Sequence, residues 1–160
     1  MIYLTNMDNN VKLGFDFLEN LPTDFGISKS KFENWAPFVL NVNFLGRTVA
    51  ITEDMQAYMT IYEIEKIFND LKHLLDDANG NEDKRITHYS SESFFEFSLE
   101  YLHVDECFSL ELWFVTAKFL ESEILGCDVG FRFTIDKTEM DRFAKELYNR
   151  FNKVCPQCSI

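Results

Sequence analysis

The chain has 160 residues, with 15 Lys and Arg against 27 Asp and Glu, so its formal net charge is −12. This acidity argues against nucleic acid as a direct ligand, because a negative surface repels the phosphate backbone. Hydrophobic residues make up 46% of the chain and include 17 Phe, which is enough apolar surface for the core of one domain. We expect that domain to span residues 1–154, and general disorder is not expected.

The start of the chain carries no secretory signal. Met1 to Asn6 lack a basic stretch followed by an apolar one, and no later apolar stretch approaches the roughly 20 residues of a membrane span. We therefore expect a cytoplasmic protein that does not use a membrane as its partner.

The first half alternates apolar and polar residues, as strands buried on one face do. Strands are predicted around 11–17 and 38–44, with a loop over 20–37 between them, and shorter strands at 47–52 and 55–59.

A helix is predicted next, from Ile61 to Asp77. Thr60 and Glu63 have the spacing of a capping box, in which each side chain bonds to the backbone of the other. The apolar residues of this segment then recur at helical spacing and form one stripe: Ile64, Ile67, Phe68, Leu71, Leu74 and Leu75.

The second half begins with a predicted hairpin, in which strands at 94–102 and 107–117 are joined by a four-residue turn. Pairing Leu102 with Cys107 makes the apolar faces of both strands coincide, and this coincidence sets the register. Trp113 then lies opposite Glu96 on the outer face.

A third strand and a second helix complete this half. The strand is predicted at 129–135 with Arg132 on the outer face, where it can offset glutamates of the neighbouring strands. The helix is predicted over 137–153, with Asp136 as its cap and Glu139 in the third position.

The order of strands, helix, strands, helix predicts an α+β fold in which antiparallel sheets carry two packed helices. The segments 11–78 and 86–152 also share a pattern, because placing Thr60 on Asp136 superimposes the caps and apolar stripes of both helices. Two explanations remain open. The halves are either related by duplication, or they are two ordinary strand-to-helix junctions that obey the same capping rules.

No motif for catalysis or nucleotide binding is found. The sequence has no G-x-S-x-G, P-loop, G-x-G-x-x-G or H-E-x-x-H. His73, His88 and His103 are expected to stand apart as solvated or packed residues. We therefore predict a protein without enzymatic activity, cofactor or metal.

Two cysteines, Cys155 and Cys158, form a C-x-x-C close to the end of the chain. The motif follows a helix instead of opening one, so the helix N-terminus that lowers a thiol pKa is missing. We expect residues 155–160 to be a flexible tail. A thiol-active domain, or one that binds a small molecule, is the alternative class of function.

A surface for a basic protein partner is the main functional prediction. On the outer face of the predicted hairpin, acidic groups surround an aromatic side chain, an arrangement suited to anchoring a basic partner. The alternatives are that a helix or loop covers Trp113, or that it marks a contact between two copies of the chain. Phe94 is expected on the same face. The candidate residues of this surface are Glu96, Glu100, Glu111 and Trp113, and those of a second, acidic rim are Asp76, Asp77, Glu82 and Asp83.

Three phrases of the sequence resemble the WapI-type immunity proteins of bacterial polymorphic toxin systems. They are AYMTIYEIEKIFNDLKHLL, YSSESFFEFSLEYL and FRFTIDKTEMDRFAKELYNRF, within a resemblance that runs from about Val39 to Phe151. The resemblance implies a small protein that binds a toxin domain, often a nuclease with a basic surface, and neutralises it by occlusion. It carries over no functional residue, and it leaves out the segment before Pro37 and the CPQC tail. A structural or adaptor protein without a toxin partner is a further alternative.

Overall fold

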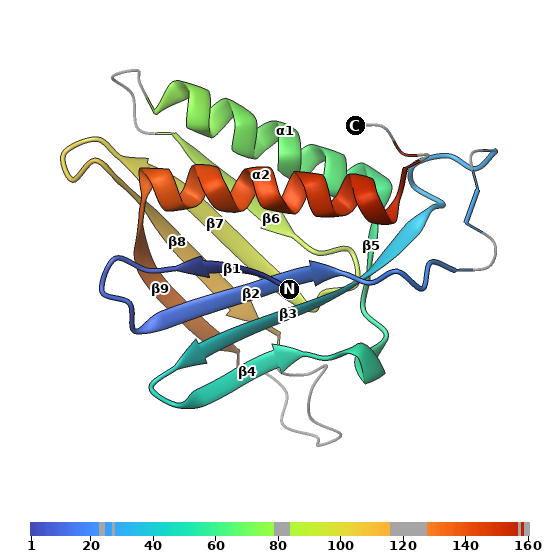
Figure 1. Ribbon diagram of the computed structural model, residues 1–160, viewed down its shortest axis with the longest axis horizontal. Helices are drawn as coiled ribbons and strands as arrows, with labels where there is room; N and C mark the ends of the chain where they lie inside the picture. Colours follow the sequence, from blue (N-terminus) through green and yellow to red (C-terminus); the bar gives the residue numbers. More distant parts are fainter. Residues whose placement is uncertain (23–24, 27, 79–83, 116–127, 157, 159–160) are drawn as a thin grey trace.

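A computed structural model describes residues 1–22, 25–26, 28–78, 84–115, 128–156 and 158. Strands precede each of two helices along the chain (Figure 1). In chain order the elements are β1 (Ile2–Thr5), β2 (Val11–Phe17), β3 (Trp35–Phe44), β4 (Arg47–Ile51), the 3₁₀ helix η1 (Glu53–Met55), β5 (Tyr58–Thr60), α1 (Ile61–Asp77), β6 (Arg85–Tyr89), β7 (Phe95–Leu102), β8 (Cys107–Phe114), β9 (Val129–Asp136) and α2 (Lys137–Val154).

The strands form two antiparallel sheets. The first has the order β1-β2-β3-β4, with β5 paired to the beginning of β3, and the second has the order β6-β7-β8-β9. Apart from β5, strands that follow one another in the sequence are neighbours in their sheet, as is usual for antiparallel sheets. The predicted α+β fold with antiparallel sheets and two helices is confirmed.

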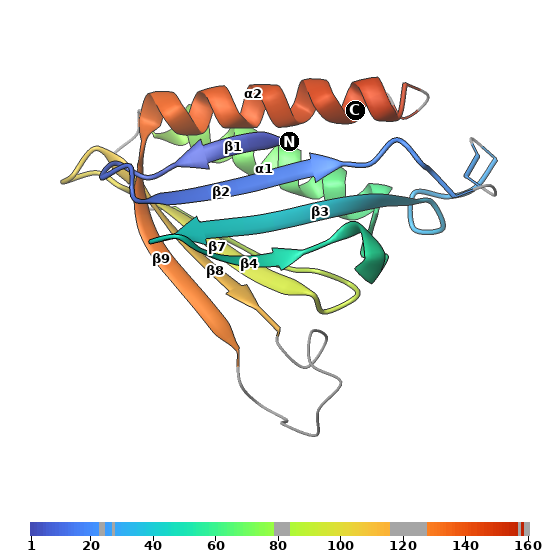
Figure 2. The ribbon, with the colours of Figure 1, turned by 60° about the horizontal axis from the view of Figure 1, so that its bottom comes forward.

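The inner faces of the two sheets and the apolar stripes of both helices form one buried cluster. Aromatic rings join the layers: Phe38 of β3 meets Phe95 of β7, and Phe151 of α2 meets both Phe17 of β2 and Phe68 of α1. Figure 2 shows α2 lying along the first sheet, beside β1. The apolar stripes of both helices pack against the inner faces of the sheets.

The predicted register of the hairpin, in which β7 pairs with β8, is confirmed. Leu102 pairs with Cys107, and Glu96 pairs with Trp113. Arg132 of β9 lies beside Glu111 of β8 on the outer face, as expected from the alternation of its strand.

The first helix is confirmed from its cap to its last residue. Thr60 accepts from the backbone of Glu63, and the Glu63 carboxylate accepts from the backbone of Thr60. In the second helix Asp136 is the cap, as predicted. Glu139 does not complete a capping box there; its carboxylate instead accepts from the Thr5 backbone and from Arg142, so it ties α2 to β1.

Several strands differ from the predictions. β1 and β6 were not predicted, because both are short and lack a clear alternation, and β3 begins at Trp35 within the expected loop. The strand predicted at 55–59 is confirmed only in part, because β5 covers Tyr58–Thr60. Before Tyr58 the chain turns through η1 and Gln56 adopts a left-handed conformation (φ 52°), so strand pairing begins later than expected.

Two residues of the predicted tail, Cys155 and Cys158, contact the core. Cys155 is fully buried, Cys158 packs against the apolar cluster, and the two form a disulfide. The single domain, the flexible tail and the duplication of 11–78 and 86–152 stay predictions. Among the described residues, neither helix combines the length and the hydropathy of a membrane-spanning segment.

Candidate functional site

The outer face of the second sheet gathers the residues predicted for partner binding. Alternation along four paired strands places one set of side chains opposite the apolar core. We call this set the outer sheet face; it comprises Arg85, Thr87, Tyr89, Glu96, Ser98, Glu100, Ser109, Glu111, Trp113, Gly130, Arg132 and Thr134. The apolar stripes of α1 and α2 pack with the inner faces of the sheets, and Trp113 is exposed, so the alternative that a helix covers Trp113 is wrong.

Two aromatic residues stand exposed on this face. Trp113 is 42% exposed and Tyr89 is 68% exposed. They belong to one row across the sheet, in which Tyr89 pairs with Glu96, Glu96 with Trp113, and Trp113 with Gly130. An exposed aromatic pair beside a carboxylate is typical of the anchoring residues of protein interfaces.

Trp113 is held in place by the glycine beside it. A Cβ atom on Gly130 would stand within 2.7 Å of three carbons of the six-membered ring, Cε3, Cζ3 and Cη2. A position so close to three neighbouring ring carbons at once must lie above the plane of the ring and not at its edge. The indole therefore rests with one face on Gly130, and only a residue without a side chain permits this approach.

The three glutamates of the outer sheet face have different surroundings. Glu111 is bridged by Arg132 and, at 3.2 Å, by Arg85, so its charge is neutralised within the sheet. The carboxylates of Glu96 and Glu100 make no hydrogen bond or ion pair within the part of the chain that the structure describes. They are thus the carboxylates that remain available to a partner.

The second predicted group, the acidic rim, is not part of this face. Asp76 and Asp77 end α1, where Asp77 pairs with Lys84. Glu82 and Asp83 lie outside the described residues.

Sequence reasoning missed Tyr89 and misplaced Phe94. Tyr89 ends the unpredicted strand β6, so its place beside Glu96 was not foreseeable without the pairing of β6 with β7. Phe94 was expected on the outer face, but β7 begins one residue later and the Phe94 side chain is buried. Its backbone N–H is held by the hydroxyl of Ser90.

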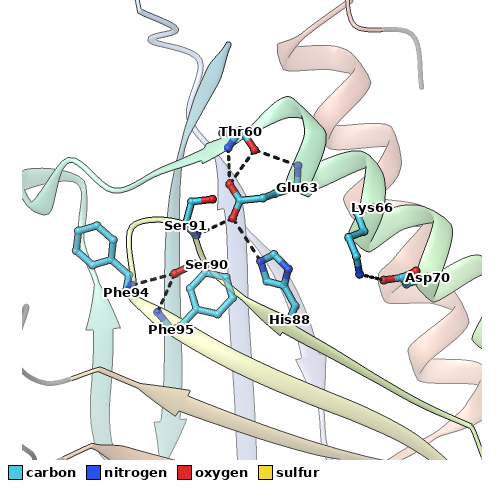
Figure 3. A network of polar contacts seen from close by, with 9 residues as sticks. All are labelled: Thr60, Glu63, Lys66, Asp70, His88, Ser90, Ser91, Phe94 and Phe95. Atoms are coloured by element: carbon cyan, nitrogen blue, oxygen red, sulfur yellow. Dashed lines mark hydrogen bonds and ion pairs between the residues drawn. The ribbon is translucent and has the colours of Figure 1, made fainter. Parts of the chain in front are cut away.

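A buried polar network joins the two halves of the fold (Figure 3). Besides its capping bonds to Thr60, the carboxylate of Glu63 accepts from the backbone of Ser91 at 2.8 Å, in the turn between β6 and β7. In that turn the carboxylate of Glu92 accepts from the backbone of Tyr58 in β5. These bonds attach the start of α1 and the end of the first sheet to the second sheet.

His88 lies beside this network and is a packed residue. Its Nε2 is 3.7 Å from Glu63, and this nitrogen has no hydrogen-bond partner in the structure. Burial lowers the pKa of His88, against the attraction of Glu63. The imidazole is therefore neutral at pH 7, and the network is a structural junction (Figure 3).

The interior offers little room for a small molecule. A cavity of about 90 Å³ lies where the sheets meet the helices, lined by apolar side chains that include Phe95, Phe97, Ile64 and Met140. Binding sites for metabolites are typically about 300–1,000 Å³ and carry converging polar groups. In the described residues no three His, Cys, Asp or Glu side chains group as metal ligands would.

Comparison with known proteins points to one family. A family model with the description "Immunity protein WapI-like family" matches residues 5–154. The match reaches further than the resemblance that the three phrases carry, because it also includes β2 and the end of α2. No curated protein matches the chain. Among solved structures, the chain is similar to one described as "Structure of the plant transcriptional regulator PBF-2", with 11% sequence identity, 98% of this chain and 81% of that chain covered, and a TM-score of 0.44.

Proposed function

We propose that this chain, which belongs to the WapI-like immunity protein family, binds a basic toxin domain through its outer sheet face and neutralises it by occlusion. No chemical step is required of the immunity protein. A bound domain of ordinary size covers about 800 Å² on each partner, enough to exclude a macromolecular substrate from a neighbouring site.

The observation that carries this proposal is the uncovered outer sheet face with its exposed aromatic pair. Antiparallel sheets commonly expose one polar face to water, but such a face does not need two large aromatic side chains. Trp113 and Tyr89 are exposed at 42% and 68%, and each supplies contact area at a low entropic cost when a partner covers it.

The charge of the chain favours a basic partner both at a distance and at direct contact. The net charge of −12 attracts a basic domain over several ångströms and speeds its encounter. At contact, Glu96 and Glu100 offer carboxylates that have no partner among the described residues. Glu111 is already paired with two arginines and contributes to the shape of the face instead.

The test is co-expression with the toxin domain encoded beside this chain, followed by pull-down and calorimetry. We expect a stable complex, protection of the cells, and a loss of both in Glu96→Lys. Asp105→Lys is the matched control, because it makes the same change of charge in the turn between β7 and β8, away from the outer sheet face. A toxin that kills despite co-expression, or equal weakening by both variants, contradicts the proposal.

A further inference from the structure

The row Tyr89–Glu96–Trp113 combines a carboxylate with an aromatic side chain on either neighbouring strand. Directly opposed residues of antiparallel strands have Cβ atoms about 4.5–5.5 Å apart. The three side chains therefore leave the sheet side by side. Both rings are exposed, whereas the Glu96 side chain is half-buried between them.

The aromatic part of this row is organised before any partner arrives. One face of the Trp113 ring is packed on Gly130, so the opposite face is the one turned to solvent. Such a ring is not free to change rotamer without losing that contact. Binding on its outer face then costs little side-chain entropy.

A flat cation fits the chemistry of this row. The face of an indole attracts a cation through its quadrupole, and an unpaired carboxylate accepts charge-assisted hydrogen bonds. A guanidinium does both at once, because it stacks on the ring while its N–H groups point outward in its plane. An ammonium is a more strongly hydrated point charge and stacks less well.

We infer that Glu96, Trp113 and Tyr89 form the anchor site for one arginine side chain of the protein partner. The inference rests on the proposed function for the existence of that partner, but not for the chemistry of the site. The neighbouring rows lack this combination. Glu111 is neutralised by Arg85 and Arg132, and Glu100 pairs across the sheet with Arg85 and Ser109, neither of them aromatic.

The experiment is an NMR titration of the ¹⁵N-labelled chain with single-residue probes, which needs no toxin. The probes are N-acetyl-arginine methylamide, the matching lysine and citrulline compounds, and the readout is the indole N–H resonance. The chain has two tryptophans, so Trp35, in β3 of the other sheet, is an internal control. We expect a weak, saturable shift of Trp113 with arginine, a smaller one with lysine and none with citrulline.

Matched variants assign the carboxylate. Glu96→Gln should weaken the arginine titration roughly threefold or more, whereas Glu100→Gln on the same strand should leave it unchanged, because an exposed charge pair contributes a modest but measurable amount. Equal shifts with arginine and citrulline, no shift of Trp113, or equal effects of both variants would overturn the anchor site. So would a dimer, found by light scattering, that Trp113→Ala dissociates.

The two proposals fail in different ways. If the toxin binds and the complex depends on this face while arginine leaves Trp113 unmoved, the anchor site is wrong and the proposed function stands. If arginine binds as expected and no toxin associates with the chain, the site is real and the immunity function is wrong.

Discussion

The indole of Trp113 lies flat on Gly130, its direct neighbour across the β8–β9 pair. This contact is the reason that a large aromatic side chain on an open sheet has a defined position. One face of the indole ring is turned to solvent. The other face occupies the space that a side chain at position 130 would fill. A glycine in the interior of a strand weakens the strand by itself, so here the loss is offset by the packed ring.

Gly130→Ala should therefore displace the indole and lower the free energy of unfolding by about 1–3 kcal/mol, the usual cost of overpacking. Urea unfolding followed by tryptophan fluorescence measures both effects. Trp113→Ala in the same chain should remove most of the cost, since the added methyl then has room. Gly14→Ala is the comparison, because the two atoms nearest its Cβ are the flexible ends of Met1 and Asn41, with the Tyr3 ring next; it should cost less than Gly130→Ala. Additive effects of the two changes at 113 and 130 would contradict the packing.

Glu63→Ala should be costly, because one buried carboxylate completes the capping box of α1 and accepts from the Ser91 backbone. Loss of its bond to the Thr60 backbone costs about 1 kcal/mol, and a buried donor left unsatisfied costs about 1–3 kcal/mol more. We expect a loss of about 2–4 kcal/mol in chemical unfolding. Glu65→Ala, which removes an ion pair with the exposed Lys31 of the adjacent loop, should cost less than about 1 kcal/mol. Equal losses would show that the junction contributes nothing beyond an ordinary surface charge.

His88 should make the stability of the fold depend on pH. Burial lowers its pKa in the folded chain below the ordinary value of 6.5, so the unfolded chain binds a proton more readily. The stability from neutral His88 is thus complete above pH 6.5 and is lost as the pH falls below it. The free energy of unfolding should drop between pH 7.5 and 5.5, and His88→Leu should reduce that drop. His73→Leu, at an exposed site on α1, should leave it unchanged; an unchanged drop in His88→Leu would contradict the assignment.

Binding to the toxin domain should weaken as salt is added. Surface charges are screened within about 10 Å at 0.1 M ionic strength and within about 3 Å at 1 M. Calorimetry over this range of salt should show that the affinity falls. The physical reason is that weaker attraction slows association of the two proteins. Glu96→Gln should flatten the dependence. An affinity that is independent of salt would mean that the acidity serves solubility instead of binding.

Substitutions at Glu111 and Glu96 should have different effects, the first on stability and the second on binding. Glu111→Gln removes the charge that Arg85 and Arg132 share, so it should lower the free energy of unfolding by about 1 kcal/mol. Glu96→Gln, whose carboxylate has no partner among the described residues, should leave stability unchanged and weaken binding. Thermal unfolding and calorimetry on the same two variants distinguish these outcomes. The reverse assignment would place the partner on Glu111.

Local chemistry in the sequence was sufficient for the helices and the hairpin. The capping box of Thr60 and Glu63, the stripe that follows it and the alternation of β7 and β8 act between near neighbours in the chain. Hydrophobic alternation also determines register, because a slip of one residue would turn every apolar side chain to solvent. Trp113 could therefore be placed opposite Glu96 without coordinates.

Only the tertiary structure shows which residues from distant segments contact those of the hairpin. Tyr89 lies beside Glu96 only because the weakly patterned β6 pairs with β7. The charge of Glu111 is neutralised only because β6 and β9 bring Arg85 and Arg132 to it. From the sequence alone, Gly130 is expected to weaken its strand, and only the structure shows that it makes room for the Trp113 ring. These relationships depend on contacts between distant segments, and no local pattern encodes them, since backbone pairing and packing space are properties of the assembled fold.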